Sequence, residues 1–129
     1  MPLLYFNEAN VTNSEAALTL TAPRDWTIAG VGELSLWTRG DAANAAEPLY
    51  VAISNTAGAP AVMAHEDPSA ATNTSWSQWR ILLQVFADQG INLTDVDKLA
   101  IGLGSKGGAA AGGTGTMYID DIRLYRAAP

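Results

Sequence analysis

The sequence contains no cysteine and only one histidine among its 129 residues. Without cysteine the chain forms no disulfide and offers no thiolate for catalysis or zinc binding, so its stability must come from a hydrophobic core. A single histidine is also too few for the zinc sites that use two or three imidazoles. The lack of cysteine does not assign the chain to a redox compartment.

Charged residues are scarce as well, at 16% of the chain, with seven basic residues and a net charge of −6. Scattered basic residues form no stripe for phosphates, which argues against a nucleic-acid partner and disfavours an anionic polymer. No run of 18 apolar residues exists, and no signal peptide is recognisable at the N-terminus. The sequence predicts a single domain over 1–129, soluble and without a membrane partner.

Alternation of apolar and polar residues dominates the chain and predicts short strands. The segment 76–85 also fits a helical stripe through Trp79, Leu82, Leu83 and Phe86, but its β-forming residues and its alternating neighbours favour a strand. About eight strands at this spacing predict an all-β sandwich or barrel. The expected strands are 3–7, 15–21, 33–39, 49–55, 61–65, 76–85, 98–103 and 115–125.

The last expected strand changes phase halfway along. Met117 and Ile119 share one face, whereas the next apolar pair, Ile122 and Leu124, is one residue out of step. A β-bulge at Asp120–Asp121 would absorb the extra residue and let both halves point at one core. Two adjacent carboxylates suit structural Ca²⁺ if neighbouring segments supply further oxygens; otherwise they form a solvated acidic kink.

Two further motifs have simple explanations. Residues 102–107 spell G-x-G-x-x-G, but the glycines and alanines that follow cannot start the helix that a dinucleotide site needs, so a plain glycine loop is favoured. His65 precedes Glu66 and Asp67, which reads as a polar strand end. A small hydrolase is therefore the third-ranked function, after two non-catalytic ones.

Aromatic and hydrogen-bonding residues on the outward phase of the strands are the best ligand candidates, because sugar rings stack on Trp and Tyr while polar side chains bind hydroxyls. We expect them to line one concave sheet face, unless Trp37 and Tyr50 simply pack under a loop. Trp76 and Trp79 are expected in the core or at a corner. The ligand candidates are Trp37, Arg39, Tyr50, Arg80 and Gln84.

Several segments together resemble the jelly-roll domains related to carbohydrate-binding modules in large secreted bacterial proteins. The similarity spans nearly the whole chain, and its motifs are more specific to the fold than to a function. The segments are DWT at 25–27, LSLW at 34–37, RGD at 39–41, EPLYV at 47–51, WSQW at 76–79 and GTMYIDDI at 115–122.

The resemblance implies an antiparallel β-sandwich of jelly-roll type, an extracellular location and a non-catalytic module for a neutral glycan. The alternative is a structural or assembly domain that makes protein contacts without binding sugar. By resemblance, Asp120 or Asp121 helps bind a structural calcium together with residues of the first strand. The chain opens at Met1–Pro2–Leu3, where such domains usually have one earlier strand, so an exposed sheet edge and a homodimer through it are expected.

Overall fold

Eight strands carry the structure, which is a computed structural model. It describes residues 2–6, 13–19, 25–27, 31–44, 48–56, 58–67, 69–104 and 114–126. In these ranges the strands are β1 (Pro2–Phe6), β2 (Asn13–Thr19), β3 (Val31–Arg39), β4 (Leu49–Ser54), β5 (Ala61–Ala64), β6 (Ser77–Leu82), β7 (Lys98–Gly104) and β8 (Thr114–Arg126).

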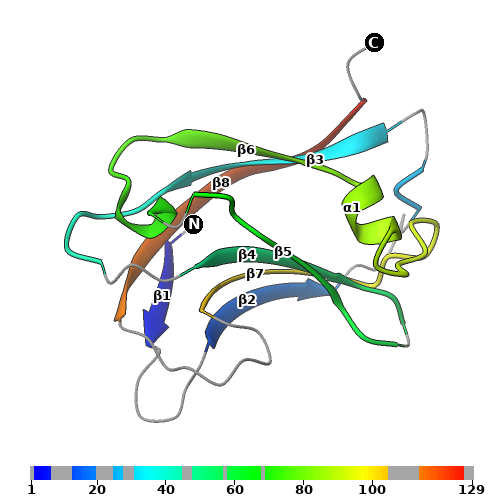
Figure 1. Cartoon of the computed structure of the whole chain (residues 1–129), viewed down its shortest axis with the longest axis horizontal. Helices are drawn as coiled ribbons and strands as arrows, with labels where there is room; N and C mark the ends of the chain where they lie inside the picture. The colour runs from blue at the N-terminus through cyan, green and yellow to red at the C-terminus, as the bar shows by residue number, and fades with distance from the viewer. Residues whose placement is uncertain are drawn as a thin grey trace.

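The strands form two antiparallel sheets packed face to face. Sheet A has the order β1-β8-β3-β6, and sheet B has the order β2-β7-β4-β5. In Figure 1, β6, β3 and β8 cross the upper part of the molecule, and β4, β7 and β2 run beneath them. The predicted β-sandwich of about eight strands is confirmed in the described residues, and each predicted strand matches an observed one within a few residues, except at the end of 76–85.

The core lies between the sheets and is built by the predicted alternation. Leu34 and Leu36 of β3 are 1% and 0% exposed, and they face inward while Ser35 between them lies on the outward side of sheet A, opposite Arg80. A fully buried side chain of this size stabilises the fold by roughly 1.5–3 kcal/mol. Further core residues are Val51, Ile53, Trp79, Ile81, Leu83, Phe86, Ile101, Leu103, Met117 and Ile119.

The ambiguous segment 76–85 contains both of the structures that its pattern allows. Strand β6 ends at Leu82, and a single helical turn, α1 (Gln84–Ala87), follows after Leu83 adopts helical dihedral angles. The strand prediction is therefore confirmed as far as Leu82 and wrong beyond it. Of the helical stripe only Phe86 lies in the helical turn, where it is buried, whereas Leu82 is 54% exposed at the end of β6. No helix in the described ranges is long and apolar enough to span a membrane.

The predicted bulge in β8 is present. Trp37 pairs with Asp120 and Ser35 pairs with Arg123, so β8 gains one residue over β3, and Asp121 has a φ of 52°. The shift turns Leu124 to the same side as its partner Leu34. That part of the expectation is correct, but Ile122 and Leu124 stay 42% and 36% exposed, so the second half of the strand is not fully buried in the core.

A short 3-10 helix of three residues, η2 (Ala70–Thr72), lies in the connection between β5 and β6. Gly40, at the end of β3, contacts this helix so closely that a Cβ placed on it would lie 1.9 Å from the carbonyl oxygen of Ala71. Only glycine allows this approach. The backbone N–H of Gly40 donates to the carbonyl of Asn73 at 2.6 Å, and that of Asp41 donates to the carbonyl of Ala71 at 3.2 Å.

Candidate binding sites

Each sheet has an outward side, which we call face A for sheet A and face B for sheet B. The predicted ligand residues do not share one of these faces. Trp37, Arg39 and Arg80 point outward on face A, whereas Tyr50 belongs to β4 and therefore lies on face B. Gln84 lies in α1, where its side chain donates a hydrogen bond to Asp88. The expectation of one shared face is wrong, because β3 and β4 follow one another in sequence but belong to opposite sheets.

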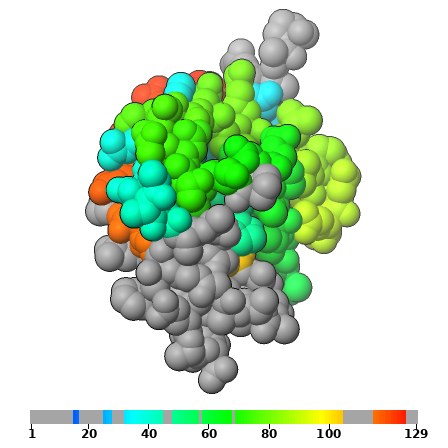
Figure 2. Space-filling view, turned by 60° about the vertical axis from the view of Figure 1, so that its left-hand side comes forward, coloured from blue at the N-terminus to red at the C-terminus, as the bar shows by residue number. Residues whose placement is uncertain are grey.

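Face A carries a three-membered stack, which we call the Arg39 stack. The guanidinium carbon of Arg39 lies 4.5 Å from the ring centre of Tyr118 and 5.5 Å from that of Trp76. Both distances are within the range of cation–π attraction. Figure 2 shows the same arrangement of segments, with the cyan end of β3 between orange β8 and the green chain leading into β6. Trp76, expected in the core or at a corner, is instead 45% exposed.

The segment that carries Trp76 is fastened to the rest of sheet A. Asn44 donates from Nδ2 to the carbonyls of Ala71 and Thr116 at 2.7 and 2.8 Å, and its Oδ1 accepts from the backbone N–H of Thr116 at 2.9 Å. Together with the contact of Gly40 on Ala71, these bonds hold the chain before β6 beside β3 and β8. The Arg39 stack is therefore built on anchored backbone.

Two other arginines of face A are paired with carboxylates, whereas the exposed Asp120 has no cationic partner among the described residues. Arg80 forms a salt bridge with Glu33 at 3.3 Å, and Arg123 forms one with Asp121 at 2.5 Å. The hydrogen bond from Arg123 to Asp121 raises the pKa of the Arg123 guanidinium. Because these salt bridges are partly or fully exposed to solvent, they add little to the stability of the fold. Their main effect is to neutralise the charges of these side chains on face A. Trp37 is half-buried between its register partners Gln78 and Asp120.

The bulge does not assemble a closed calcium site from the described residues. The Asp121 carboxylate is bound by Arg123, and Asp120 accepts from the backbone N–H of Asp121 at 2.8 Å. Within the described ranges no group of three or more His, Cys, Asp or Glu residues is placed to hold a metal ion. Calcium needs six to eight oxygen ligands, and these two carboxylates supply only part of such a set. Structural calcium stays a prediction from the resemblance.

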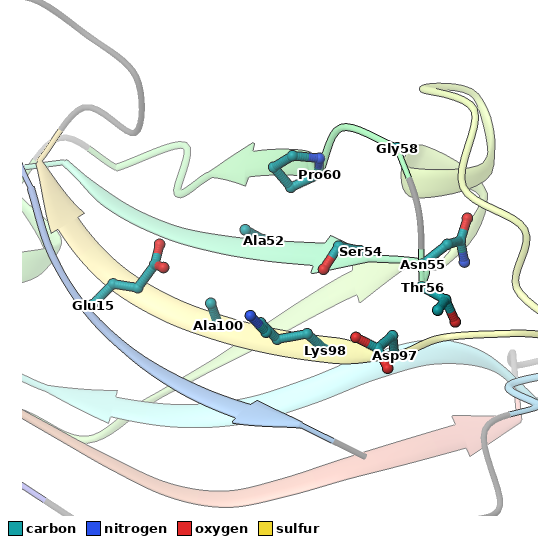
Figure 3. Close-up of a pocket in the computed structure, with 10 residues that line it drawn as sticks. All are labelled: Glu15, Ala52, Ser54, Asn55, Thr56, Gly58, Pro60, Asp97, Lys98 and Ala100. Carbon is teal, nitrogen blue, oxygen red and sulfur yellow. The ribbon is translucent and has the colours of Figure 1, made fainter. Parts of the chain in front are cut away.

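Face B contains a pocket of about 310 Å³, at the lower end of the size range of small-molecule sites. Its floor consists of Ala52 and Ala100, which are register partners on β4 and β7. Figure 3 shows the polar side chains around this floor, all on the side of sheet B away from β3 and β8. The complete lining is Glu15, Ala52, Ser54, Asn55, Thr56, Gly58, Pro60, Asp97, Lys98 and Ala100.

Tyr50 does not line the pocket, but it contacts the lining residue Glu15. It is 1% exposed, and its hydroxyl donates to Oε1 of Glu15 at 2.7 Å. Both residues are register partners of Gly102 on β7, which has no side chain to separate them. Tyr50 therefore fixes the position of the Glu15 carboxylate and does not offer a stacking surface.

At the other end of the floor, Ser54 and Lys98 face each other across β4 and β7. Neither side chain makes a hydrogen bond or ion pair to another described residue. The side-chain amide of Asn55 beside them is occupied by hydrogen bonds within the protein. It donates to the carbonyls of Asn92 and Asp95 and accepts from the backbone N–H of Asn92. The groups available to a ligand are thus the Lys98 ammonium and the Ser54 hydroxyl.

Glu15, Ser54 and Lys98 were not identified from the sequence. The sequence feature that would have found them is a lack of large side chains. The outward positions of the neighbouring strands hold alanine and glycine, which leaves the middle of face B hollow. The prediction from the sequence relied on large outward aromatic residues, and it therefore favoured face A.

The pocket carboxylates are not arranged for glycoside hydrolysis. On β7, Gly102 stands opposite Glu15, and Asp97 lies five residues earlier, which corresponds to roughly 17 Å of strand. Figure 3 shows Ala100 and Lys98 between Glu15 and Asp97. Glycosidase carboxyl pairs lie at most about 9.5 Å apart.

His65 does not join the pocket either. Its ring centre lies 4.7 Å from that of Trp79, and its Nδ1 accepts from the backbone N–H of Asp67 at 3.0 Å. Burial is the main influence on this side chain and lowers the pKa of His65, although Asp67 and Glu66 act in the opposite direction. The His65–Glu66–Asp67 motif is a strand end with a local turn, in agreement with the simple explanation.

Comparisons with known proteins bear on the fold. No protein-family model matches the chain, and no curated protein matches it. Among solved structures, the chain is similar to a family 11 carbohydrate-binding module from Clostridium thermocellum in complex with a β-1,3-1,4-mixed-linked tetrasaccharide. The TM-score is 0.59 at 15% identity, over 89% of this chain and 69% of that chain. The likeness confirms a β-sandwich of jelly-roll type, of the kind found in carbohydrate-binding modules.

Proposed function

We propose that this protein is a non-catalytic binding module that holds a neutral glycan in the pocket of face B. The observation that supports the proposal best is the pocket itself, which combines an alanine floor with hydrogen-bonding groups at both ends. The similar solved module was studied with a bound tetrasaccharide, which makes a glycan the first ligand class to test.

The chemistry of the pocket favours uncharged polar ligands. The apolar side of a sugar ring rests on Ala52 and Ala100, while Lys98 donates to hydroxyl groups and Ser54 both donates and accepts. At the other end of the pocket, the Glu15 carboxylate accepts a hydrogen bond from a sugar hydroxyl. Because Glu15 and Asp97 are acidic and Lys98 is basic, the lining offers no net positive charge to an anionic ligand.

The proposal is tested by isothermal titration calorimetry with soluble neutral oligosaccharides, including a β-1,3-1,4-linked glucan tetrasaccharide. We expect binding by the native chain and at least about a tenfold loss of affinity in a Lys98→Ala, Ser54→Ala double variant, because each lost hydrogen bond weakens binding by about 1 kcal/mol. Arg80→Gln on face A is the matched control and should bind normally. A full panel without binding, or an unaffected double variant, would refute the pocket proposal.

A second candidate function is assembly through a sheet edge, and one observation favours it. Leu82 is 54% exposed at the end of β6, which is an edge strand of sheet A. On sheet B, the edge strand β5 is blocked because the side chain of Gln89 donates to the carbonyl of Val62 and accepts from its N–H, at 3.0 and 3.1 Å. An open apolar edge can pair with a second copy.

Light scattering across a concentration series tests this candidate. A homodimer through β6 should dissociate in a Leu82→Lys variant, because a charge on the edge opposes pairing. Leu82 is exposed, so the same substitution should leave the thermal stability of the monomer nearly unchanged. A native chain that stays monomeric at high concentration would remove the assembly function.

A further inference from the structure

We propose that the Arg39 stack on face A is a second binding site, specific for a single carboxylate carried by a sugar, such as one uronic acid residue within an otherwise neutral glycan. This site lies on the opposite side of the sandwich from the pocket of face B, and it uses none of the residues of that pocket. It therefore stands or falls independently of the neutral-glycan proposal.

Arg39 differs from the other described arginines of face A in its charge environment. Among the described residues of face A, Arg80 and Arg123 each have a carboxylate partner, whereas Arg39 contacts only two aromatic rings. The side chain of Arg39 is half-buried, and its Nε is buried without a hydrogen-bond partner. A guanidinium that has lost water on one side and has no counter-ion gains most from an anionic oxygen on its remaining side.

The Arg39 guanidinium is also held in place before any ligand binds. Tyr118 on β8 and Trp76 just before β6 hold the guanidinium, so little rotational freedom is lost when a ligand binds. The segment that carries Trp76 is itself anchored through Asn44 and Gly40. A planar guanidinium in a fixed position suits bidentate binding of a planar carboxylate.

The surroundings of Arg39 favour a sugar over an acidic peptide as the ligand. Trp76 is 45% exposed beside the guanidinium, and it offers a ring face on which the C–H side of a pyranose can stack. A polyanion would need several free cations, and in the described part of face A only Arg39 is without a carboxylate. The net charge of −6 further opposes a polyanion, but it opposes a single carboxylate much less.

The test uses a matched pair of ligands, a xylo-oligosaccharide bearing one glucuronic acid and the same molecule with its carboxylate reduced to the alcohol. Affinities are measured in the Lys98→Ala, Ser54→Ala background, so that face B does not contribute. We expect the acidic ligand to bind about tenfold or more tightly than the reduced one, with a preference that weakens as sodium chloride is raised. Equal affinities, or no binding of either ligand, would overturn the proposal.

Four variants locate the site. Arg39→Gln should abolish the preference for the acidic ligand, and Arg39→Lys should restore only part of it, because lysine keeps the charge but loses the bidentate geometry. Trp76→Ala should weaken both ligands by removing the stacking surface. Arg80→Gln, which removes a guanidinium already paired with Glu33, should change neither affinity. Preference retained in Arg39→Gln, or a glutamate-rich peptide that displaces the sugar, would contradict the assignment.

Discussion

Faces A and B are built by the same alternation of inward and outward residues, yet they differ in almost every physical property. On face A the outward positions hold Trp37, Arg39 and Tyr118, so the surface is filled by rings and guanidinium groups. On face B the central outward positions hold Ala52 and Ala100, so the surface is hollow. The inward residues determine the fold, whereas the size of the outward residues decides whether a sheet offers a platform or a pocket.

The two faces also differ in how their polar groups are held. The Arg39 guanidinium on face A is held by aromatic rings, whereas the Glu15 carboxylate on face B is held by the Tyr50 hydroxyl. This difference implies that the two sites can be disrupted separately. Single substitutions should therefore disrupt one site at a time, and the largest effect is expected at Gly40.

Substitution of Gly40 by alanine should damage face A and spare face B. The new Cβ would lie 1.9 Å from the carbonyl oxygen of Ala71, so the segment carrying Trp76 must move away from β3. We expect a loss of about 1–3 kcal/mol in the free energy of unfolding, measured with denaturant, because overpacking a tight contact costs that amount. The preference for the acidic ligand should disappear while neutral-glycan binding persists. Unchanged stability would contradict the close contact.

Tyr50→Phe should affect face B alone. The variant keeps the buried ring but removes the hydroxyl that donates to Glu15, so the carboxylate loses its fixed position. Stability should fall by roughly 0.5–1.5 kcal/mol, and neutral-glycan affinity should fall several-fold. Calorimetry checks both, with ligand preference at the Arg39 stack as the internal control. Full neutral-glycan affinity in the variant would show that Glu15 does not contact the ligand.

The smallest predicted effect concerns His65, which belongs to neither face. Burial lowers the pKa of its side chain below the ordinary value of 6.5, so the unfolded chain binds more protons than the folded one. Its contribution to stability is therefore complete above pH 6.5 and is lost as the pH falls below that value. Chemical unfolding between pH 7.5 and 5 should show a shallower decline in a His65→Gln variant. An identical pH dependence in both proteins would exclude the effect.

The sequence was sufficient for most of the fold because alternation reports burial directly. The bulge at Asp121 was also predictable, since the hydrophobic phase must slip where the strand gains a residue. The end of β6 was not, because Leu83 and Phe86 satisfy both a strand and a helical pattern and only tertiary contacts decide between them.

The candidate sites were less predictable because they depend on which sheet a strand joins. Alternation placed Trp37, Arg39 and Tyr50 on the outward phase correctly, but it does not reveal that β3 and β4 belong to different sheets. It also cannot show that Tyr50 is covered or that Trp76 is brought beside Arg39. Long-range contacts of this kind follow from topology, not from local pattern.

The most direct test of the central claim is a nuclear magnetic resonance titration of the native chain with the neutral β-1,3-1,4-linked tetrasaccharide. We predict chemical-shift changes at the backbone amides of Ala52, Ser54, Lys98 and Ala100, with the amides of Arg39 and Trp76 unaffected. Changes confined to face A, or none at saturating ligand, would contradict the assignment of the neutral glycan to the pocket of face B.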